Sequence, residues 1–358
     1  MLIKKNKHLT NIKRMRVSEG RDLINGLRLD RNEKVDNWEP NLIENILKTY
    51  PECFHSTYPE ITSLYKKLSN HLEVDEKQIL ISSGIDGAIK NLLEVVCDTN
   101  DNIAVFSPTY AMYQVYCDIF QLNLFPINYT KNYNINEDNL NDFLNNDPKI
   151  LFIPNPNQPI ESCLSLRDIE ILAKKCLEKK CIIVLDEAYF LFGADSSIPL
   201  LRKFENLVVM RTFSKGFGMP SIRVGVTIAN DSIMSIISKP RLAHELSSLS
   251  IIIAEYLIDN FEIVKKNCER VIESRKYVSL ELNNLGLVTH GSNGNFLLIS
   301  FDSSDTAEVV VNKLRDEKIY VKGPWKEPWS NSITISIGPK DMMKRFIDTL
   351  KVILDSIN

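Results

Sequence analysis

The sequence lacks the cysteine pattern of a disulfide framework or of a zinc site. Its seven cysteines are scattered singly, their number is odd, and no two of them are separated by two residues; they stand at positions 53, 97, 117, 163, 176, 181 and 268. Because neither paired cysteines nor closely spaced metal ligands are present, we expect no metal, no disulfides and a protein of the reducing cytoplasm.

The chain also lacks a long hydrophobic run and a strong charge of one sign. The apolar stretch SLSIIIAEYLI, at 248–258, is shorter than the roughly 18 residues that a membrane helix needs, and it contains Glu255. No signal-peptide pattern opens the sequence. The net charge is -3, so neither nucleic acid nor an anionic membrane is an expected partner. The basic run at 3–16 is predicted to be a solvated arm.

The composition is that of an ordinary soluble globular protein. Of the 358 residues, 44% are hydrophobic and 25% are charged. This length allows one large domain and a smaller one. The sequence pattern changes near residue 240. We therefore expect an N-terminal arm at 1–44 that packs with the small domain, a large domain at 45–240 and a small domain at 241–358.

Strand-like and helical segments alternate between residues 60 and 230. The predicted strands are apolar on both faces, which is typical of a buried, mostly parallel sheet. They cover 78–83, 102–108, 122–127, 149–154, 181–188 and 206–212. Helical spacing falls at 63–72, 87–96 and 110–120. This alternation predicts an α/β fold with right-handed crossovers.

The segments after residue 240 predict a smaller α+β domain. One long helical stretch is expected at 241–283. The elements expected after it are a strand at 295–300, a helix at 306–316, strands near 319–322 and 333–337, and a final helix at 340–356.

Polar and glycine-containing segments follow five of the predicted strands. They are GIDG at 84–87, PTY at 108–110, NPNQP at 155–159, DEAY at 186–189 and TFSK at 212–215. Because open α/β sheets bind ligands at the carboxyl ends of their strands, we expect these segments to line one crevice.

Lys215 and Asp186 suit the chemistry of pyridoxal phosphate, an aldehyde cofactor whose ring accepts electrons. A partly desolvated lysine forms a Schiff base with an aldehyde, and the glycines beside Lys215 let a cofactor approach the backbone. An acid such as Asp186 keeps a pyridine nitrogen protonated. The free amides of Ile85 and Asp86, at a helix N-terminus, form a seat for phosphate.

Further side chains complete this set. Tyr110 can stack on the ring, and Tyr189 can hydrogen-bond a phenolate oxygen. Hydroxyl groups and a guanidinium for the phosphate come from Thr212, Ser214 and Arg223. Taken singly, each feature also has a structural interpretation, such as a solvated lysine, a turn or a core tyrosine. Their joint occurrence at strand ends favours the cofactor site.

Five motifs together identify a family resemblance: SSGIDGAIK, SPTYAMY, NPNQP, VLDEAYF and TFSKGFGMPSIRVG. The set resembles the fold-type I pyridoxal-phosphate enzymes of aminotransferase classes I and II over roughly residues 25–350. Within that family it is similar to histidinol-phosphate aminotransferases and to amino-acid-phosphate decarboxylases such as threonine-phosphate decarboxylase. The resemblance implies the fold of aspartate aminotransferase, with a large domain and a small one.

The resemblance also implies a role for each matching residue. Lys215 matches the Schiff-base lysine, which is also the general acid and base, and Asp186 matches the partner of the pyridine nitrogen. Tyr189 matches the contact to the phenolic oxygen, and Tyr110 matches the stacking aromatic residue. The phosphate cup is matched by Ile85, Asp86, Thr212, Ser214 and Arg223.

Tyr58, in HSTYPE, matches a tyrosine that reaches the cofactor phosphate of the neighbouring subunit. The resemblance therefore implies a homodimer with shared sites.

The sequence departs from the family pattern N-P-x-N-P-T-G, in which the second asparagine contacts the phenolic oxygen. Gln158 stands at that position, and Ile160 and Glu161 replace threonine and glycine. Gln158 keeps the amide on a longer side chain, and Asn157 is adjacent, so both remain candidates.

A second departure concerns the substrate. The family strand R-I-x-x-G carries an arginine that clamps the substrate α-carboxylate, and here that position is Thr334. Threonine cannot form a bidentate charged clamp, and the loss weakens carboxylate binding by roughly 1.5–3 kcal/mol per contact. Upstream, Lys322 replaces an arginine that meets the substrate phosphate in histidinol-phosphate aminotransferases. Arg31 is another candidate anion partner, and either cation can equally be a surface charge.

The Thr334 departure decides the predicted reaction. A decarboxylase needs the bond to the carboxylate perpendicular to the cofactor ring, which a weak clamp allows. We therefore predict a carboxy-lyase acting on a small amino-acid phosphate, of the O-phosphoserine or O-phosphothreonine class, that yields an amino-alcohol phosphate such as ethanolamine phosphate. An aminotransferase similar to histidinol-phosphate aminotransferase, acting on a small phosphorylated substrate, is the alternative. A non-catalytic homologue that binds pyridoxal phosphate is the third possibility.

Overall fold

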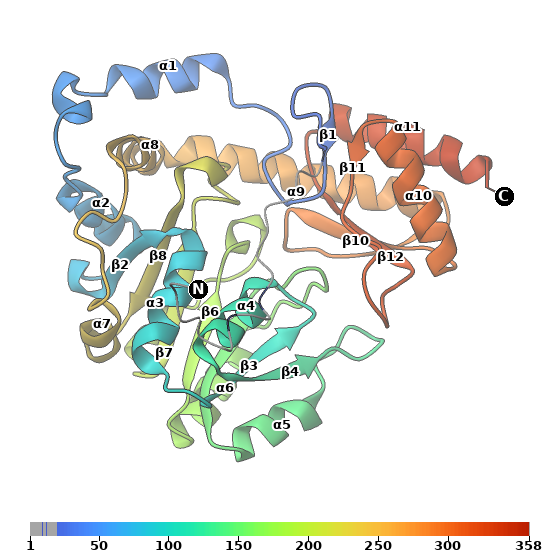
Figure 1. Cartoon of the computed structure of the whole chain (residues 1–358). Coiled ribbons are helices and arrows are strands. Elements are labelled where there is room, and N and C mark those ends of the chain that lie inside the picture. The colour runs from blue at the N-terminus through green and yellow to red at the C-terminus, as the bar shows by residue number, and fades with distance from the viewer. Residues whose placement is uncertain (1–8, 10–11, 13–19, 358) are drawn as a thin grey trace, which may run out of the picture.

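The computed structural model of the protein describes residues 9, 12 and 20–357 (Figure 1). The basic run at 3–16 lies outside the described residues, apart from Leu9 and Ile12, so its prediction as a solvated arm stays a prediction.

A seven-stranded sheet, here called the large sheet, forms the centre of residues 20–240. Its strand order is β2-β8-β7-β6-β5-β3-β4, and its strands are parallel except for β8, which is antiparallel to both neighbours. The strands are β2 (Ile79–Ser83), β3 (Asn102–Ser107), β4 (Asn123–Asn128), β5 (Pro148–Pro154), β6 (Ile182–Asp186), β7 (Leu207–Thr212) and β8 (Val224–Ala229). The predicted α/β class with a mostly parallel sheet is confirmed.

Helices cover both faces of the large sheet. They are α2 (Thr62–Leu72), α3 (Gly84–Val96), α4 (Met112–Phe120), α5 (Glu137–Asn145), α6 (Leu166–Glu178) and α7 (Asp231–Ile237). Successive residues of a strand enter different cores: on β6, Val184 packs in the cluster of α3, α4 and α7, whereas Ile183 and Leu185 pack in the cluster of α2, α5 and α6. This explains why the strands are apolar at every position.

A second, smaller sheet forms among the residues after 285. It is antiparallel with the order β12-β10-β9, and its strands are β9 (Val288–His290), β10 (Phe296–Ser300) and β12 (Ser332–Ser336). Its hydrophobic core also takes side chains from α9 (Phe261–Asn284), α10 (Ser304–Asp316) and α11 (Lys340–Asp355). Figure 1 shows this small sheet and its helices beside the large sheet, with α9 extending from next to α8 across to the small sheet.

The prediction of one helix over 241–283 is wrong. Residues 241–247 are not helical, α8 covers Ser248–Asp259, and α9 begins at Phe261 after a break at Asn260. The Ser247 side chain accepts a hydrogen bond from the amide of Ser250, which caps the start of α8. Neither α8 nor any other helix of residues 20–357 is long and apolar enough to cross a membrane.

The N-terminal segment joins the small sheet's core. Strand β1 (Leu27–Arg28) pairs in parallel with β11 (Ile319–Tyr320), and Leu29 and Val35 are buried among small-sheet residues. Helix α1 (Pro40–Lys48) follows. Short 3-10 turns complete the elements at Glu52–His55, Glu76–Gln78, Phe190–Phe192, Ile198–Arg202 and Pro220–Ile222. The division into domains at residues 44 and 240 stays a prediction.

Candidate active site

The carboxyl ends of β5, β6 and β7 lie side by side. Pro154 is opposite Asp186, and Asp186 is opposite Met210, in the two parallel pairings. The amide of Asn155 donates to the carbonyl of Asp186 at 2.8 Å, and the amide of Glu187 donates to the carbonyl of Met210 at 2.8 Å. The segments that follow these strands therefore lie along one edge of the large sheet.

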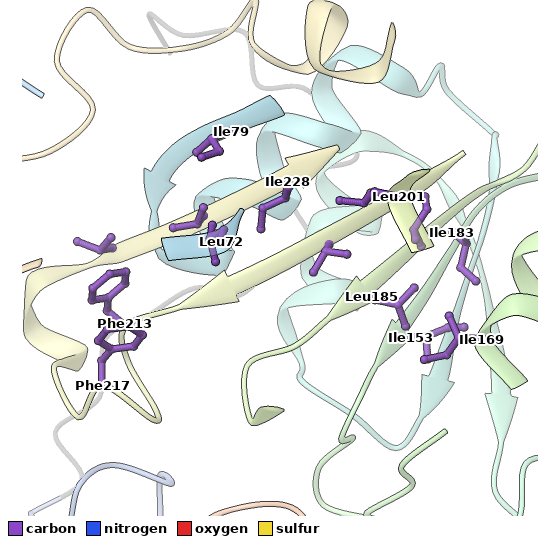
Figure 2. Close-up of a cluster of buried hydrophobic side chains, with 14 of the residues drawn as sticks. Leu72, Ile79, Ile153, Ile169, Ile183, Leu185, Leu201, Phe213, Phe217 and Ile228 are labelled. Carbon is purple, nitrogen blue, oxygen red and sulfur yellow. The ribbon is translucent and has the colours of Figure 1, made fainter. Parts of the chain in front are cut away.

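Two phenylalanines hold the loop that carries Lys215. Phe213 and Phe217 are buried in the core with their ring centroids 4.0 Å apart, and Figure 2 shows the two rings side by side. The amide of Gly218 donates to the carbonyl of Lys215 at 2.9 Å, which closes a tight turn. A Cβ atom on Gly216 would lie 2.5 Å from the Leu191 side chain, so only glycine fits there.

The amine of Lys215 is held by the backbone of the N-terminal segment. Its Nζ donates to the carbonyl oxygens of Arg31 at 2.9 Å and Asn32 at 3.1 Å. Burial lowers the pKa of Lys215 from 10.5 to about 8, although the charges of Glu33 and Asp186 act in the opposite direction. Lys215 is therefore the desolvated amine that its sequence neighbourhood predicts.

Asp186 ends β6 and is 6% exposed. The hydroxyl of Tyr113 donates to its Oδ2 at 2.7 Å, and the amide of Ala188 donates to its Oδ1 at 3.1 Å. Burial raises the pKa of Asp186 to about 6, against the lowering effect of the Tyr113 hydrogen bond. Sequence reasoning missed Tyr113, and no local pattern marks it, because it reaches Asp186 across 73 residues of sequence.

Tyr189 meets a residue that the sequence did not single out. The side-chain amide of Asn32 donates to the Tyr189 hydroxyl at 3.0 Å, and the Lys215 Nζ lies 5.7 Å from the centroid of the Tyr189 ring. Burial raises the pKa of Tyr189 above its usual value, so its hydroxyl stays protonated. The N-terminal segment therefore contacts both Lys215 and Tyr189.

The predicted phosphate seat lies at the start of α3. Arg223 Nη2 is 3.4 Å from Asp86 Oδ2, and the Tyr110 hydroxyl donates to Asp86 Oδ1 at 2.7 Å. Arg223 immediately precedes β8, and the pairing of β8 with β2 and β7 brings these residues together. On the β7 side, Thr212 Oγ1 donates to Ser214 Oγ at 3.0 Å.

Asn157 and Gln158 differ in their freedom to bind a ligand. Asn157 is fully buried, and its Nδ2 donates to the carbonyl oxygens of Pro108 at 3.0 Å and Ile160 at 2.8 Å. Gln158 is half-buried, and within residues 20–357 its side chain makes no hydrogen bond. The Asn157 amide nitrogen is thus committed to the backbone, whereas the amide of Gln158 is not.

The three candidate substrate residues have different surroundings. Thr334 is 1% exposed, and its Oγ1 accepts a hydrogen bond from Trp325 Nε1 at 2.8 Å. Lys322 pairs with Thr334 through backbone hydrogen bonds of 3.0 and 2.7 Å. Arg31 has an exposed side chain, with its Nε 3.9 Å from Asp30 Oδ2, and only its carbonyl contacts Lys215.

Tyr58 lies far out on the surface. It is 82% exposed and stacks on His244 with a centroid distance of 4.4 Å and an interplanar angle of 2°. Within the described residues it makes none of the contacts that join Lys215, Asp186 and Asp86.

The residues present fit pyridoxal phosphate on three observations. Lys215 is a half-buried amine with a lowered pKa, and Asp186 is a buried carboxyl whose pKa is raised. The phosphate seat is a bare-backbone cradle: a Cβ atom on Gly84 would lie 2.5 Å from the Arg223 guanidinium, and one on Gly225 would lie 2.3 Å from the Gly84 backbone. These groups would hold the Schiff-base aldehyde, the ring nitrogen and the phosphate.

Comparison with known proteins agrees with this arrangement. The sequence model of the family described as aminotransferase class I and II matches residues 27–350. The histidinol-phosphate aminotransferase of Clostridium novyi (strain NT) is 27% identical over 329 residues, which cover 91% of this chain and 91% of that protein.

Solved structures show the same fold. Histidinol-phosphate aminotransferase from Sinorhizobium meliloti, in complex with pyridoxal-5'-phosphate, has a TM-score of 0.84 at 22% identity, over 92% of this chain and 91% of that chain. L-threonine-O-3-phosphate decarboxylase from Porphyromonas gingivalis has a TM-score of 0.76 at 20% identity, over 92% and 99%. The predicted family, fold and pyridoxal phosphate cofactor are thus confirmed, and the chain belongs to the aminotransferase class I and II family.

Proposed function

We propose that this pyridoxal-phosphate enzyme is an aminotransferase that acts on a small phosphorylated amine of the histidinol phosphate kind. The observation that carries the proposal is the placement of Lys215 and Asp186 after the neighbouring strands β7 and β6, with Lys215 Nζ held by two backbone carbonyls and Asp186 by the Tyr113 hydroxyl. The lowered pKa of Lys215 and the raised pKa of Asp186 agree with this placement. Relatives named as histidinol-phosphate aminotransferases, which match over nine-tenths of the chain, support transamination. They favour this reading over the decarboxylase that the Thr334 departure suggests.

The protein's own residues prepare the reaction. When bound, pyridoxal phosphate supplies an aldehyde that captures amines and a ring that draws electrons from the substrate. Lys215 presents its Nζ as the amine for that aldehyde and, once released, carries a proton at Nζ. Because its pKa is about 8, roughly a tenth of it is neutral at pH 7, which suits both tasks. Asp186, oriented by Tyr113, offers Oδ1 and Oδ2 to a protonated ring nitrogen.

Cofactor binding uses the start of α3 and the end of β7. The amides of Ile85 and Asp86 and the guanidinium of Arg223 would hold the phosphate dianion, with the hydroxyls of Thr212 and Ser214 beside them. Tyr110, whose hydroxyl is fixed on Asp86, would present its ring to the cofactor.

We assign the phenolic-oxygen contact of the N-P-x-N-P motif to Gln158 rather than to Asn157. The Asn157 amide already donates to two backbone carbonyls, whereas the Gln158 amide is unengaged among residues 20–357. Tyr189 would share that contact.

The substrate phosphate would meet Lys322 or Arg31. An amino-alcohol phosphate such as histidinol phosphate has no carboxylate and therefore needs no arginine at position 334. An α-amino acid donor does need a carboxylate partner, and Thr334 offers none because its hydroxyl is buried against Trp325. Because a carboxylate that is held only weakly suits decarboxylation, the Thr334 position keeps decarboxylation of a small amino-acid phosphate as the second candidate reaction.

We further propose a cytoplasmic homodimer in which Tyr58 reaches the cofactor phosphate of the neighbouring site. The exposed ring of Tyr58 and its lack of contact with its own site, among the described residues, support this assignment. The proposed division remains an arm at 1–44, a large domain at 45–240 and a small domain at 241–358. The hydrophobic clusters support it, since two of them pack on the two faces of the large sheet and a third packs on the small sheet.

The test separates the reactions. Purified enzyme is mixed with glutamate alone, with histidinol phosphate and a keto acid, and with O-phosphoserine or O-phosphothreonine. Transamination predicts that glutamate bleaches the visible cofactor band and that histidinol phosphate is consumed without carbon dioxide. Release of carbon dioxide with formation of ethanolamine phosphate from O-phosphoserine would instead establish the decarboxylase.

Lys215→Ala is the matched control for the whole assignment. It should lose the visible band that the cofactor gives in the wild-type protein, together with all turnover in these assays. Normal turnover in this variant would overturn the proposed function. A wild-type protein that shows the visible band but turns over none of these substrates would indicate the non-catalytic homologue.

A further inference from the structure

Asn32 stands at the junction of the N-terminal segment, the small sheet and the lysine loop. Its φ is 52°, in the left-handed region, where asparagine is among the few residues other than glycine that are well tolerated. It is 5% exposed. A buried polar side chain in this conformation requires defined hydrogen-bond partners.

Ser336 of β12 fixes the orientation of the Asn32 side chain. The Asn32 backbone amide donates to Ser336 Oγ at 2.8 Å, so the serine oxygen is already an acceptor. The serine proton then goes to Asn32 Oδ1, at 3.3 Å. Because Oδ1 faces the serine, Nδ2 is the group that faces Tyr189.

The Asn32 Nδ2 therefore donates to the hydroxyl oxygen of Tyr189, at 3.0 Å. A phenol that accepts this bond keeps its own proton free for another acceptor. Within residues 20–357, Asn32 is the only hydrogen-bond partner of the Tyr189 hydroxyl. The Asn32 carbonyl meanwhile accepts from Lys215 Nζ at 3.1 Å and from Asn295 Nδ2 at 3.1 Å.

We infer that Asn32 is a positioning residue of the active site, which keeps the hydroxyl proton of Tyr189 directed to the cofactor oxygen that Tyr189 contacts. The inference rests on the proposed pyridoxal-phosphate site. It goes beyond that site because the hydrogen bonds of the Asn32 side chain go to Tyr189 and Ser336, whereas Lys215 contacts only its carbonyl. It acts through Tyr189.

The consequence is measurable in the colour of the bound cofactor. A donor that favours the anionic phenolic oxygen lowers the pH midpoint of the cofactor's visible absorbance. Loss of the donor's alignment raises that midpoint. The charged groups that face this region are Asp186 on β6, Glu33 on the N-terminal segment and Arg223 before β8. All three stay unchanged in the variants below, and no variant alters a charge.

The test is a double-mutant cycle on the holoenzyme. Asn32→Gly suits the positive φ and keeps the three backbone contacts to Ser336, Lys215 and Asn295, so it removes only the side chain. We expect it to raise the absorbance midpoint by about half a pH unit to one unit, and Tyr189→Phe to raise it by about one unit or more. In the Tyr189→Phe background, Asn32→Gly should add nothing, because its effect passes through the missing hydroxyl.

Two further variants keep the test decisive. Asn295→Ala removes a contact to the Asn32 carbonyl but not to its side chain, and it should leave the midpoint unchanged. If Asn32→Gly does not fold, Ser336→Ala is the substitute. It removes the hydrogen bond that orients the Asn32 side-chain amide, leaves Asn32 itself unchanged, and should also raise the midpoint.

A midpoint unchanged in both Asn32→Gly and Ser336→Ala, or an additive shift in the double variant, would overturn the inference while leaving the proposed function intact. Absence of a visible band in the wild-type protein would instead count against the proposed function. A purely structural role for Asn32 would lower the melting temperature without moving the midpoint.

Discussion

The proposed role of Asp186 as partner of the ring nitrogen carries a cost in the free energy of unfolding. An unfolded aspartate has a pKa near 3.8, whereas burial raises that of Asp186 to about 6. The ionised carboxyl is therefore disfavoured by folding, and this destabilisation is fully present above pH 6. It fades as the pH falls toward 4, where both states hold the proton.

Asp186→Asn should therefore stabilise the cofactor-free protein. At pH 7.5 we expect a gain of about 1 to 3 kcal/mol in the free energy of unfolding, because the amide removes the buried charge while its Oδ1 still accepts from Ala188 and its Nδ2 donates to the Tyr113 hydroxyl oxygen instead of accepting from it. The gain should shrink to nearly zero at pH 4. Urea unfolding of the cofactor-free protein across this range measures it, and activity should fall at least about a hundredfold.

The exposed Asp118, treated in the same way, is the control for this prediction. Asp118→Asn should leave both the free energy of unfolding and the activity unchanged. A destabilised Asp186→Asn protein at pH 7.5 would show that its ionised carboxyl contributes favourably to the fold.

At the residue scale, the sequence predicts side chains whose chemistry is distinctive and misses those that act through others. Lys215, Asp186 and Arg223 stand directly beside strand ends, and their position along the chain is enough to bring them to one edge of the sheet. Tyr113 and Asn32 contact the site across 73 and 157 residues of sequence, respectively. No local pattern encodes such pairings, because they depend on how the N-terminal segment and α4 pack on the sheet.

At the scale of elements, the start of α3 combines a glycine in the left-handed region with the predicted phosphate seat. Gly84 has a φ of 70°, and a Cβ atom there would lie 2.5 Å from Arg223 Nη2. The clash falls on the far end of a flexible side chain, so the guanidinium would move rather than the backbone. The movement would carry Arg223 away from Asp86 and from the phosphate seat.

Gly84→Ala should therefore weaken cofactor binding more than it weakens the fold. Gly286→Ala is a matched control, since Gly286 has a φ of 80° and open space around its Cβ position. Both variants should lose about 1 kcal/mol of stability from the left-handed backbone. Only Gly84→Ala should raise the dissociation constant of pyridoxal phosphate, by about tenfold or more.

Titration of the cofactor-free proteins with pyridoxal phosphate, followed by absorbance, gives these constants. Equal affinities in the two variants would show that the displaced guanidinium is not needed for the phosphate.

Element boundaries were predictable where polarity changes sharply and not elsewhere. Six of the seven strands of the large sheet begin and end within one or two residues of the expected positions, because each is a short apolar run followed by glycine, proline or a polar group. The seventh, β8, was not predicted. The break between α8 and α9 escaped prediction since hydrophobic residues continue on both sides of Asn260. The side chain that caps the start of α8 is Ser247, and residues 241–246 offer no comparable start of a helix.

At the scale of the whole molecule, two groups of contacts tie the large sheet to the small one. The Tyr133 ring, in the loop after β4, stacks between His290 at 3.9 Å and Trp329 at 4.9 Å. The Glu161 carboxylate, in the loop after β5, enters the 291–294 turn between β9 and β10. Both contacts join loops of the large sheet to β9 and to the loops of the small sheet.

Glu161 is held there by backbone amides. Its Oε1 accepts from Ser292 and Asn293, each at 2.8 Å, and its Oε2 accepts from Gly294 at 2.9 Å. On the other side of the turn, Arg275 of α9 donates to the carbonyl oxygens of Ser292 and Gly294. The departure from the family motif at this position thus has a structural reason, because glycine offers no carboxylate to this turn.

Glu161→Ala should loosen the junction between the sheets without unfolding either core. Three amides lose their acceptor, at a cost of about 1 to 3 kcal/mol, and hydrogen exchange at residues 292–294 should quicken by about tenfold or more. Amides of β10 should exchange as before, since their partners on β9 and β12 are intact. Glu161→Gln keeps one carbonyl acceptor, so its exchange rate at residues 292–294 should lie between those of the wild type and Glu161→Ala. The surface variant Glu170→Gln should exchange at the wild-type rate. Unchanged exchange at 292–294 in Glu161→Ala would mean that Arg275 alone holds the turn, and that the carboxylate contributes nothing to the position of the small sheet.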